Sequence, residues 1–321
     1  MRRTLMALVA LLGLTATLPV AAQSPYPTQT ITIVVPFGPG SGTDIVSRLV
    51  AQKLADSLGK PVVVSNKPGA SGSIAAEFVA KAKPDGYTLL MGTNSTHGAN
   101  PALLKEMRYD PIKDFEHVNR VAVFTSIVAV NPGLPVNSMR ELLAYGKANE
   151  LTLATGNATG IVQGETLAQM VGWKTLLRVP FKSNPDAMTE VIAGRVNFMF
   201  SDIAAAQAQI KAGRLKALAV TSKQRSTLMP ELPTVMESGV SDFDLSGWNA
   251  LFTTAGTPRE IVALLNAEIA KIVQTPEVLG RLRELGAEPG PLSPADFAAW
   301  VQGEVNTWTR LAKAAGIQPG L

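Results

Sequence analysis

The fold of this chain is decided by the stretch Thr30-Ile-Thr-Ile-Val-Val-Pro-Phe-Gly-Pro-Gly-Ser-Gly-Thr-Asp-Ile-Val-Ser-Arg-Leu-Val-Ala-Gln-Lys-Leu54. Its β-branched run Ile31–Val35 predicts a buried strand, because Ile and Val pack well on a sheet covered on both faces. The glycines and prolines of residues 36–43 break regular structure, and the spacing of Ile45, Leu49 and Leu54 then predicts a helix. The first N–H groups of a helix lack internal partners and carry partial positive charge. The strand, glycine loop and helix together therefore form a cradle for an anion.

Length and composition favour two lobes without a bound cofactor. The chain has 321 residues, 46% of them hydrophobic, which is enough for a large core. Its formal charge is +4, and Arg2 and Arg3 of the leader supply two of these charges, which leaves 4 − 2 = +2 and argues against a nucleic-acid surface. There are no cysteines, and the two histidines, His97 and His117, lack metal-binding spacing. We expect neither a metal nor a cofactor.

The first 22 residues predict a signal peptide. Two arginines precede the apolar run Leu5–Val20, and Ala21-Ala22 gives a small-residue cleavage site that would leave Gln23 first. The alternative is a membrane anchor, but the apolar run is short and is interrupted by Gly, Thr and Pro. We therefore expect an exported protein.

Strands and helices alternate after the opening stretch. Residues 61–65 and 87–91 predict strands, with a helix at 74–82 between them. Such alternation predicts a parallel sheet, whose ligands usually bind at the carboxyl ends of the strands. The loops Phe37–Asp44 and Gly92–Asn100 lie at such ends.

The same alternation of strands, loops and helices predicts a second lobe. The strand 151–154 leads into the loop Thr155–Gly160 and a helix, and the strand 196–202 ends in Ser201-Asp202. The strand-like runs 120–130 and 248–254 are suited to cross between lobes, and two crossings make a hinge. We expect an α/β protein in which residues 23–123 and 248–321 form lobe 1 and residues 124–247 form lobe 2.

Several motifs recur in an order and spacing typical of one family. They are Val35-Pro-Phe-Gly-Pro-Gly40 with Thr43-Asp44 and Arg48, Asn66-Lys-Pro-Gly-Ala70, Pro84-Asp-Gly-Tyr-Thr-Leu-Leu90, Tyr109-Asp-Pro-Ile-Lys-Asp-Phe115, Val179-Pro-Phe-Lys182, Glu237-Ser-Gly239 and Gly256-Thr-Pro258. With them the chain resembles, from about Tyr26 to its C-terminus, the Bug-type periplasmic solute-binding receptors of tripartite tricarboxylate transporters. The resemblance implies two Rossmann-like lobes of the periplasmic-binding-protein type II kind, joined by two hinge strands. It also implies a monomeric, non-enzymatic receptor in the periplasm that captures a small carboxylate or dicarboxylate and delivers it to membrane permease subunits.

The resemblance further implies that backbone N–H groups and bridging waters of two lobe 1 loops hold a ligand carboxylate, while two segments of lobe 2 meet its other polar groups. The candidate ligand-binding residues are Phe37, Gly38, Gly40, Ser41, Gly42, Thr43, Asp44, Asn94, Ser95, Thr96, His97, Thr155, Gly156, Asn157, Ala158, Thr159, Ser201 and Asp202.

The chain departs from the family pattern at three places. Ser41 interrupts a pair of glycines, and Ser183 follows Lys182 where a glycine is common. A histidine that often precedes the second-lobe helix is absent from Ile161–Glu165, which predicts the loss of one polar contact.

Alternatives remain for individual residues. The spacing Gly38-x-Gly40-x-Gly42 loosely matches a dinucleotide fingerprint, but the third glycine is misplaced and the second strand ends in Ser65-Asn66 without an acidic residue. The glycine loop could also be a purely structural turn. Asp44 is suited either to cap the helix or to contact ligand, with Arg48 as its i+4 partner. Asp202 is suited either to orient a ligand amino, amide or hydroxyl group or to cap the next helix.

Two other functions stay open at this point. The protein could present its ligand to a signalling kinase instead of a transporter, which the sequence does not distinguish. An exported hydrolase would need a serine activated by His97 or His117, but the sequence has no Gly-x-Ser-x-Gly motif. His97 itself is suited either to stabilise its loop or to contact ligand.

Overall fold

The opening stretch forms the strand β1 (Ile31–Val35) and the helix α1 (Gly42–Leu58), as predicted, in a computed structural model that describes residues 26–320. β1 is almost fully buried, and α1 begins at Gly42 because the Ser41 hydroxyl accepts the Asp44 N–H at 3.2 Å. The helix ends at Gly59, whose φ of 65° suits the left-handed C-cap. The predicted signal peptide lies outside the described residues.

The first lobe contains a six-stranded sheet with the order β11-β4-β10-β3-β1-β2. Besides β1, its strands are β2 (Val62–Asn66), β3 (Thr88–Thr93), β4 (Phe115–Phe124), β10 (Gly247–Thr254) and β11 (Ala287–Pro289). β1 pairs in parallel with β2 and β3, but β10 runs antiparallel to both β3 and β4. The predicted parallel pairing is confirmed for β1, β2 and β3. The sheet as a whole is mixed, because β4 leaves the lobe and β10 returns to it in the opposite direction.

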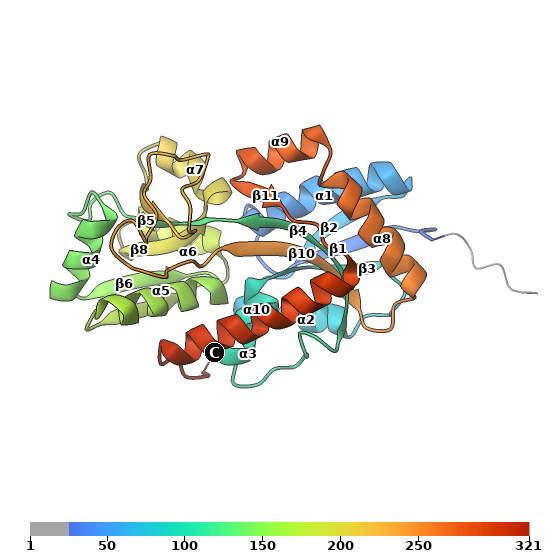
Figure 1. Ribbon diagram of the computed structural model, residues 1–321, viewed down its shortest axis with the longest axis horizontal. Helices are drawn as coiled ribbons and strands as arrows, with labels where there is room; N and C mark the ends of the chain where they lie inside the picture. Colours follow the sequence, from blue (N-terminus) through green and yellow to red (C-terminus); the bar gives the residue numbers. More distant parts are fainter. Residues whose placement is uncertain (1–25, 321) are drawn as a thin grey trace, which may run out of the picture.

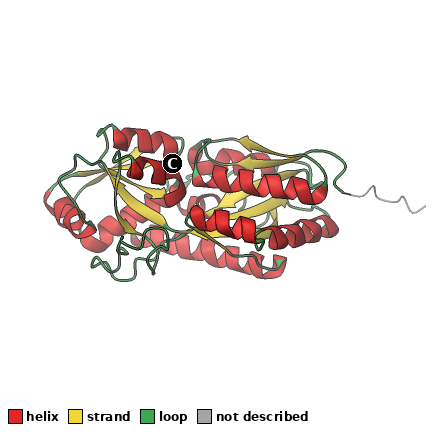
Figure 2. Cartoon of the chain, turned by 90° about the horizontal axis from the view of Figure 1, so that it is seen from above, coloured by secondary structure: helices red, strands yellow, loops and turns green. Residues whose placement is uncertain are grey.

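Helices cover both faces of this sheet (Figures 1 and 2). One face packs on α1, α8 (Arg259–Ile272) and α9 (Pro276–Glu284), and the other packs on α2 (Ser73–Ala80) and α10 (Pro294–Ala314). A 3-10 turn η1 (Ala70–Gly72) precedes α2. The polar loop expected at Gly92–Asn100 is wrong: β3 continues to Thr93, and a π-helical turn η2 (Ser95–Ala99) and a short helix α3 (Asn100–Leu103) follow.

The second lobe contains a five-stranded sheet with the order β7-β6-β8-β5-β9. Its strands are β5 (Ser126–Val130), β6 (Leu151–Thr155), β7 (Leu176–Pro180), β8 (Phe198–Asp202) and β9 (Lys216–Val220). The helices α4 (Met139–Ala148) and α5 (Ala158–Val171) pack on one face, and α6 (Asn184–Ile192) and α7 (Ile203–Lys211) pack on the other. Both lobes thus have the expected α/β architecture.

Two segments connect the lobes. The run 120–130 divides at Thr125, so that β4 pairs in the first sheet and β5 in the second. On the return path, the Leu245 N–H donates to the Thr221 carbonyl of the second lobe, and Gly247 pairs with Phe124 of the first. Figure 1 shows these segments side by side between the lobes. No helix within residues 26–320 is long and apolar enough to cross a membrane.

The C-terminal helix α10 also joins the two lobes. Its distal residues Trp308 and Ala312 pack in one apolar cluster with Ala158 and Ile161 of α5. Figure 1 shows α10 extending from the first lobe along the second. The second lobe is therefore held by a helix contact as well as by the crossing segments.

Candidate functional site

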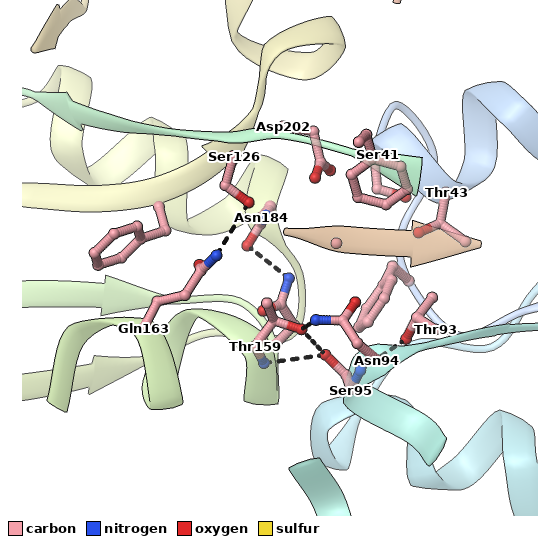
Figure 3. A pocket seen from close by; sticks show the side chains of 15 residues that line it. Ser41, Thr43, Thr93, Asn94, Ser95, Ser126, Thr159, Gln163, Asn184 and Asp202 are labelled. Atoms are coloured by element: carbon pink, nitrogen blue, oxygen red, sulfur yellow. Dashed lines mark hydrogen bonds between the residues drawn. The ribbon is translucent and has the colours of Figure 1, made fainter. Parts of the chain in front are cut away.

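A polar cavity of about 20 Å³ lies between the lobes, where the cleft narrows to the crossing segments. Figure 3 shows side chains from both lobes pointing into it. Its lining residues are Phe37, Ser41, Thr43, Thr93, Asn94 and Ser95 of lobe 1, Phe124, Ser126 and Gly247 at the crossings, and Asn157, Thr159, Gln163, Asn184, Phe200 and Asp202 of lobe 2. This volume has room for one or two water molecules, so the lobes are close together in this structure.

The N-terminus of α1 forms one wall of the cavity. Ser41 caps the helix, and Asp44 accepts the Gly40 N–H at 3.0 Å instead of pointing into the cavity. Asp44 also pairs with Arg48 at 3.0 Å and accepts from Asn66 at 2.9 Å, and the Arg48 and Gly40 bonds hold its pKa below the ordinary value against the opposing effect of burial. Asp44 therefore stabilises the loop, and its carboxylate is neutralised beside the anion cradle.

A hydrogen-bond network joins the end of β3 to the start of α5 across the cleft. Asn94 Nδ2 donates to Thr159 Oγ1 at 2.7 Å, and the hydroxyls of Ser95 and Thr159 lie 2.8 Å apart. The Thr159 N–H donates to Ser95 Oγ at 3.1 Å. All three residues are buried, so these bonds hold the two lobes together out of solvent.

The second lobe contributes amide side chains. Asn157 caps α5 by accepting the Gly160 N–H at 2.8 Å, and its Nδ2 donates to Asn184 Oδ1 at 3.3 Å. Gln163 donates to Ser126 Oγ at 3.3 Å and to the Leu245 carbonyl at 2.8 Å. Gln163 lies in the stretch where the sequence predicted a missing polar contact, and it supplies a polar group to the cavity wall.

Four hydroxyl groups of the lining are free to donate. The oxygens of Ser41, Thr43, Thr93 and Ser126 each accept an N–H of a backbone or side-chain amide at 3.2–3.3 Å. Among the described residues, none of these hydroxyls donates a hydrogen bond to the protein. Since a hydroxyl can donate while it accepts, their protons are available to an anionic group in the cavity.

Asp202 is the one ionisable side chain among the described lining residues. It comes from the end of β8 and points into the cavity beside Ser41, opposite Asn94 and Thr159 (Figure 3). Burial raises the pKa of its carboxyl to about 6, although a hydrogen bond from the Gly42 backbone N–H acts in the opposite direction. Asp202 is also the N-cap residue of α7, but its side chain accepts no capping hydrogen bond there.

His97 lies outside the cavity, in the core of lobe 1. The π-helical turn directs its ring onto Phe252, with centroids 3.9 Å apart, and its Nδ1 lies 2.9 Å from the Thr96 hydroxyl. The ring is fully buried, and this burial holds its pKa well below the ordinary value. His97 is therefore a neutral core residue that the structure does not bring to the cavity.

Eight of the candidate residues line the cavity, and ten do not. The eight are Phe37, Ser41, Thr43, Asn94, Ser95, Asn157, Thr159 and Asp202. The ten others are Gly38, Gly40, Gly42, Asp44, Thr96, His97, Thr155, Gly156, Ala158 and Ser201. Several of these shape its walls: an added Cβ on Gly156 would lie 2.3 Å from the Asn184 backbone nitrogen, so this glycine lets two loops meet. Thr155 lines a larger opening of about 530 Å³ at the cleft, together with Ser71, Lys182 and Asp186.

Sequence reasoning missed seven lining residues, which are Thr93, Phe124, Ser126, Gln163, Asn184, Phe200 and Gly247. A polar residue at a strand end was the available signal for Thr93 and Ser126. The other five come together only through the packing of the two lobes.

The chain matches the family described as "Tripartite tricarboxylate transporter family receptor" (TctC) over residues 46–317. It is 33% identical to the protein BugT of Bordetella pertussis over 303 residues, which cover 93% of this chain and 92% of BugT. An R. palustris protein solved with adipate has a TM-score of 0.89 and 35% identity, covering 92% of this chain and all of that one. MatC from Rhodopseudomonas palustris, solved with bound malate, has a TM-score of 0.83 and 31% identity, covering 89% of this chain and 99% of MatC.

The family match spans most of the chain, and the relatives align along nearly their whole lengths. They share the two lobes and the mixed sheets described above. The chain therefore belongs to the tripartite tricarboxylate transporter receptor family, whose members are solute-binding receptors.

Proposed function

We propose that this protein captures a small carboxylate or dicarboxylate between its lobes for uptake by a tripartite transporter. The observation that carries this proposal is the set of free hydroxyl donors in the cavity, on Ser41, Thr43, Thr93 and Ser126. Hydrogen bonds from neutral donors to a charged acceptor contribute about 1.5–3 kcal/mol each. Such donors, two of them at the N-terminus of α1, can hold a carboxylate without a lysine or arginine among the described lining residues.

Two relatives support the choice of ligand class. The structures solved with adipate and with malate are both 31% or more identical to this chain and share its fold. Both ligands are dicarboxylates, which differ in length and in one hydroxyl group. Their common chemistry, a carboxylate at the end of a short carbon chain, fits the free hydroxyl donors of this cavity.

Binding then proceeds by opening and closure of the lobes. The cavity of about 20 Å³ is too small for a dicarboxylate, so the lobes separate to admit the ligand. Closure places donors of both lobes on it, and the bonds from Asn94 and Ser95 to Thr159 exchange for bonds to the ligand. The crossing segments at Thr125 and near residue 246 act as the hinge.

We also propose the lobe boundaries, the location and the membrane partners of this receptor. Residues 23–123 and 248–321 form lobe 1, and residues 124–247 form lobe 2. The protein is exported by its N-terminal signal peptide, works in the periplasm as a monomer, catalyses no reaction, and presents its closed form to membrane permease subunits. The ligand-binding residues are the lining residues of the cavity together with the backbone of the loop 37–44.

A titration of ligand-free protein tests the function. We would unfold and refold the protein to remove co-purified ligand, and then measure melting temperature and heat of binding with a panel of mono- and dicarboxylates. A ligand at 100 times its Kd stabilises the folded form by about 2.7 kcal/mol, which is a clear thermal shift. Ser126→Ala should weaken the tightest binder, while Ser241→Ala on an exposed loop should not. A refolded protein that responds to none of these acids would exclude the proposed ligand class.

A further inference from the structure

The Asp202 carboxylate has no positively charged partner among the described lining residues of the cavity. An ideal Cβ on Gly42 would lie 2.5 Å from Oδ2, so the carboxyl group lies against the start of α1, where the Gly42 N–H acts to lower its pKa. Among the described lining residues there is no lysine, arginine or histidine. The carboxylate therefore has one neutral partner and faces the space that the ligand would occupy (Figure 3).

An anionic ligand in this cavity would meet a second negative charge. Two carboxylates in one poorly hydrated site repel each other, and a buried charge without a partner is costly. One solution is a ligand that places a hydroxyl or an ammonium group against Asp202 while its own carboxylate binds the hydroxyl donors. The other is that Asp202 binds a proton and itself donates to the ligand.

The geometry favours the first solution. The free donors Thr93 and Thr43 belong to lobe 1, and Asp202 belongs to the facing strand end of lobe 2. The cavity thus combines hydroxyl donors with one carboxylate acceptor, which lies beside Ser41. A molecule with a carboxylate and a neighbouring hydrogen-bond donor can bond to the hydroxyls and to Asp202 together, whereas a plain carboxylate leaves the Asp202 acceptor unmatched.

We propose that Asp202 makes this receptor select hydroxy or amino acids over the corresponding plain carboxylic acids. This inference rests on the proposed function, because it assigns the ligand class of the same cavity. Asp202 would accept a hydrogen bond from the hydroxyl or ammonium group of the ligand once the lobes close. It would thereby act as a specificity-determining residue and not as a catalytic one.

Matched ligand series test the inference. We would titrate the refolded protein at pH 8 with succinate, malate and aspartate, and with the series adipate and 2-aminoadipate, and compare Kd within each series. The expected result is that the hydroxy or amino acid binds at least about tenfold more tightly than its plain analogue, because a charge-assisted hydrogen bond is gained. In Asp202→Asn this preference should shrink toward unity. Asp242→Asn, an exposed acid-to-amide change elsewhere in lobe 2, should keep it.

Three outcomes would count against the inference in different ways. If plain carboxylates bind as tightly as their substituted analogues, the selection is refuted while the proposed carboxylate receptor stands. If binding of succinate or adipate takes up a proton from the buffer and tightens as the pH falls from 8 to 5, Asp202 becomes protonated when the ligand binds, and the selection is again refuted. If no acid of either series binds, the proposed function fails as well. Circular dichroism and melting temperature of Asp202→Asn establish that the variant is folded.

Discussion

The contact between Gly42 and Asp202 gives a sharp test of lobe closure. An ideal Cβ on Gly42 would lie 2.5 Å from Asp202 Oδ2, 2.8 Å from Cγ and 3.0 Å from Cβ. Rotation of the Asp202 side chain about its Cα–Cβ bond moves Oδ2 and Cγ away, but Asp202 Cβ is fixed by the end of β8. Gly42→Ala should therefore keep the lobes from closing fully, because the two residues belong to different lobes.

The expected size of the effect follows from this overlap. Forcing an extra methyl into a packed contact costs about 1–3 kcal/mol. This cost falls on the closed form alone, so ligand affinity should fall by about 5- to 150-fold, since each 1.4 kcal/mol corresponds to about tenfold. Within lobe 1 the change should be neutral or stabilising by a few tenths of a kcal/mol, since alanine is a better helix former than glycine.

Calorimetric titration with the tightest acid of the panel measures the affinity, and urea denaturation without ligand measures the stability. Gly303→Ala within α10 is the matched control, because its added Cβ would meet nothing within 4 Å. In an Asp202→Gly background, which removes the atoms that the new methyl meets, Gly42→Ala should have no further effect on affinity. Wild-type affinity in Gly42→Ala would refute the idea that this contact forms when the lobes close on ligand.

Three further predictions concern stability. Gly156→Ala should destabilise the protein by about 3 kcal/mol, because its Cβ would lie 2.3 Å from backbone atoms of the facing loop, whereas Gly160→Ala, with 3.5 Å to its nearest neighbour, should be tolerated; equal denaturation midpoints would contradict this. Burial lowers the pKa of His97 and His117 in the folded protein. Below about pH 6.5 the unfolded chain binds a proton on each imidazole, so the free energy of unfolding falls by up to about 1.4 kcal/mol per histidine and pH unit. In His97→Phe the unfolding free energy should fall less steeply between pH 6.5 and 5 than in the wild type. An unchanged slope would contradict the lowered pKa of His97. The pKa of Asp202 is raised from 3.8 to about 6, so the free energy of unfolding falls as the pH rises from about 4 to 6, and the loss is complete above pH 6. Asp202→Asn should therefore add about 1–2 kcal/mol at pH 8 and nothing near pH 4, and an equal gain at both pH values would contradict this.

The first lobe could be predicted well because its signals are local. The run Ile31–Val35 can be buried on both faces only as an inner strand, and the glycines after it can only form a turn before α1. Ser41 was predicted as a ligand-binding residue and noted as a departure from the family pattern. The structure gives it a physical role, because its hydroxyl sets the start of α1 and still lines the cavity.

The buried position of His97 in the core of lobe 1 could not be predicted from the residues next to it in the sequence. The sequence left open whether His97 stabilises its loop or contacts ligand. A π-helical turn rotates the ring toward Phe252, a residue 155 positions away that belongs to the returning strand β10. No local pattern specifies which ring will be available for stacking there. The place of Gln163 in the cavity wall could not be predicted for the same reason, because its hydrogen-bond acceptors, Ser126 and Leu245, lie on the two crossing segments.

The division of the cavity between the lobes links specificity to closure. The hydroxyl donors that fit a carboxylate lie mostly on lobe 1, near elements that the sequence specifies locally, whereas Asp202 and all the lining amide groups except that of Asn94 lie on lobe 2. A carboxylate alone can bind the open lobe 1, but closure then brings Asp202 toward a like charge, which offsets part of the gain from the lobe 2 donors. A ligand that also offers a donor favours the closed form by its differential contacts, which is what a ligand-driven conformational change requires. The same carboxyl group would in this way determine both which acid binds and whether the receptor closes on it.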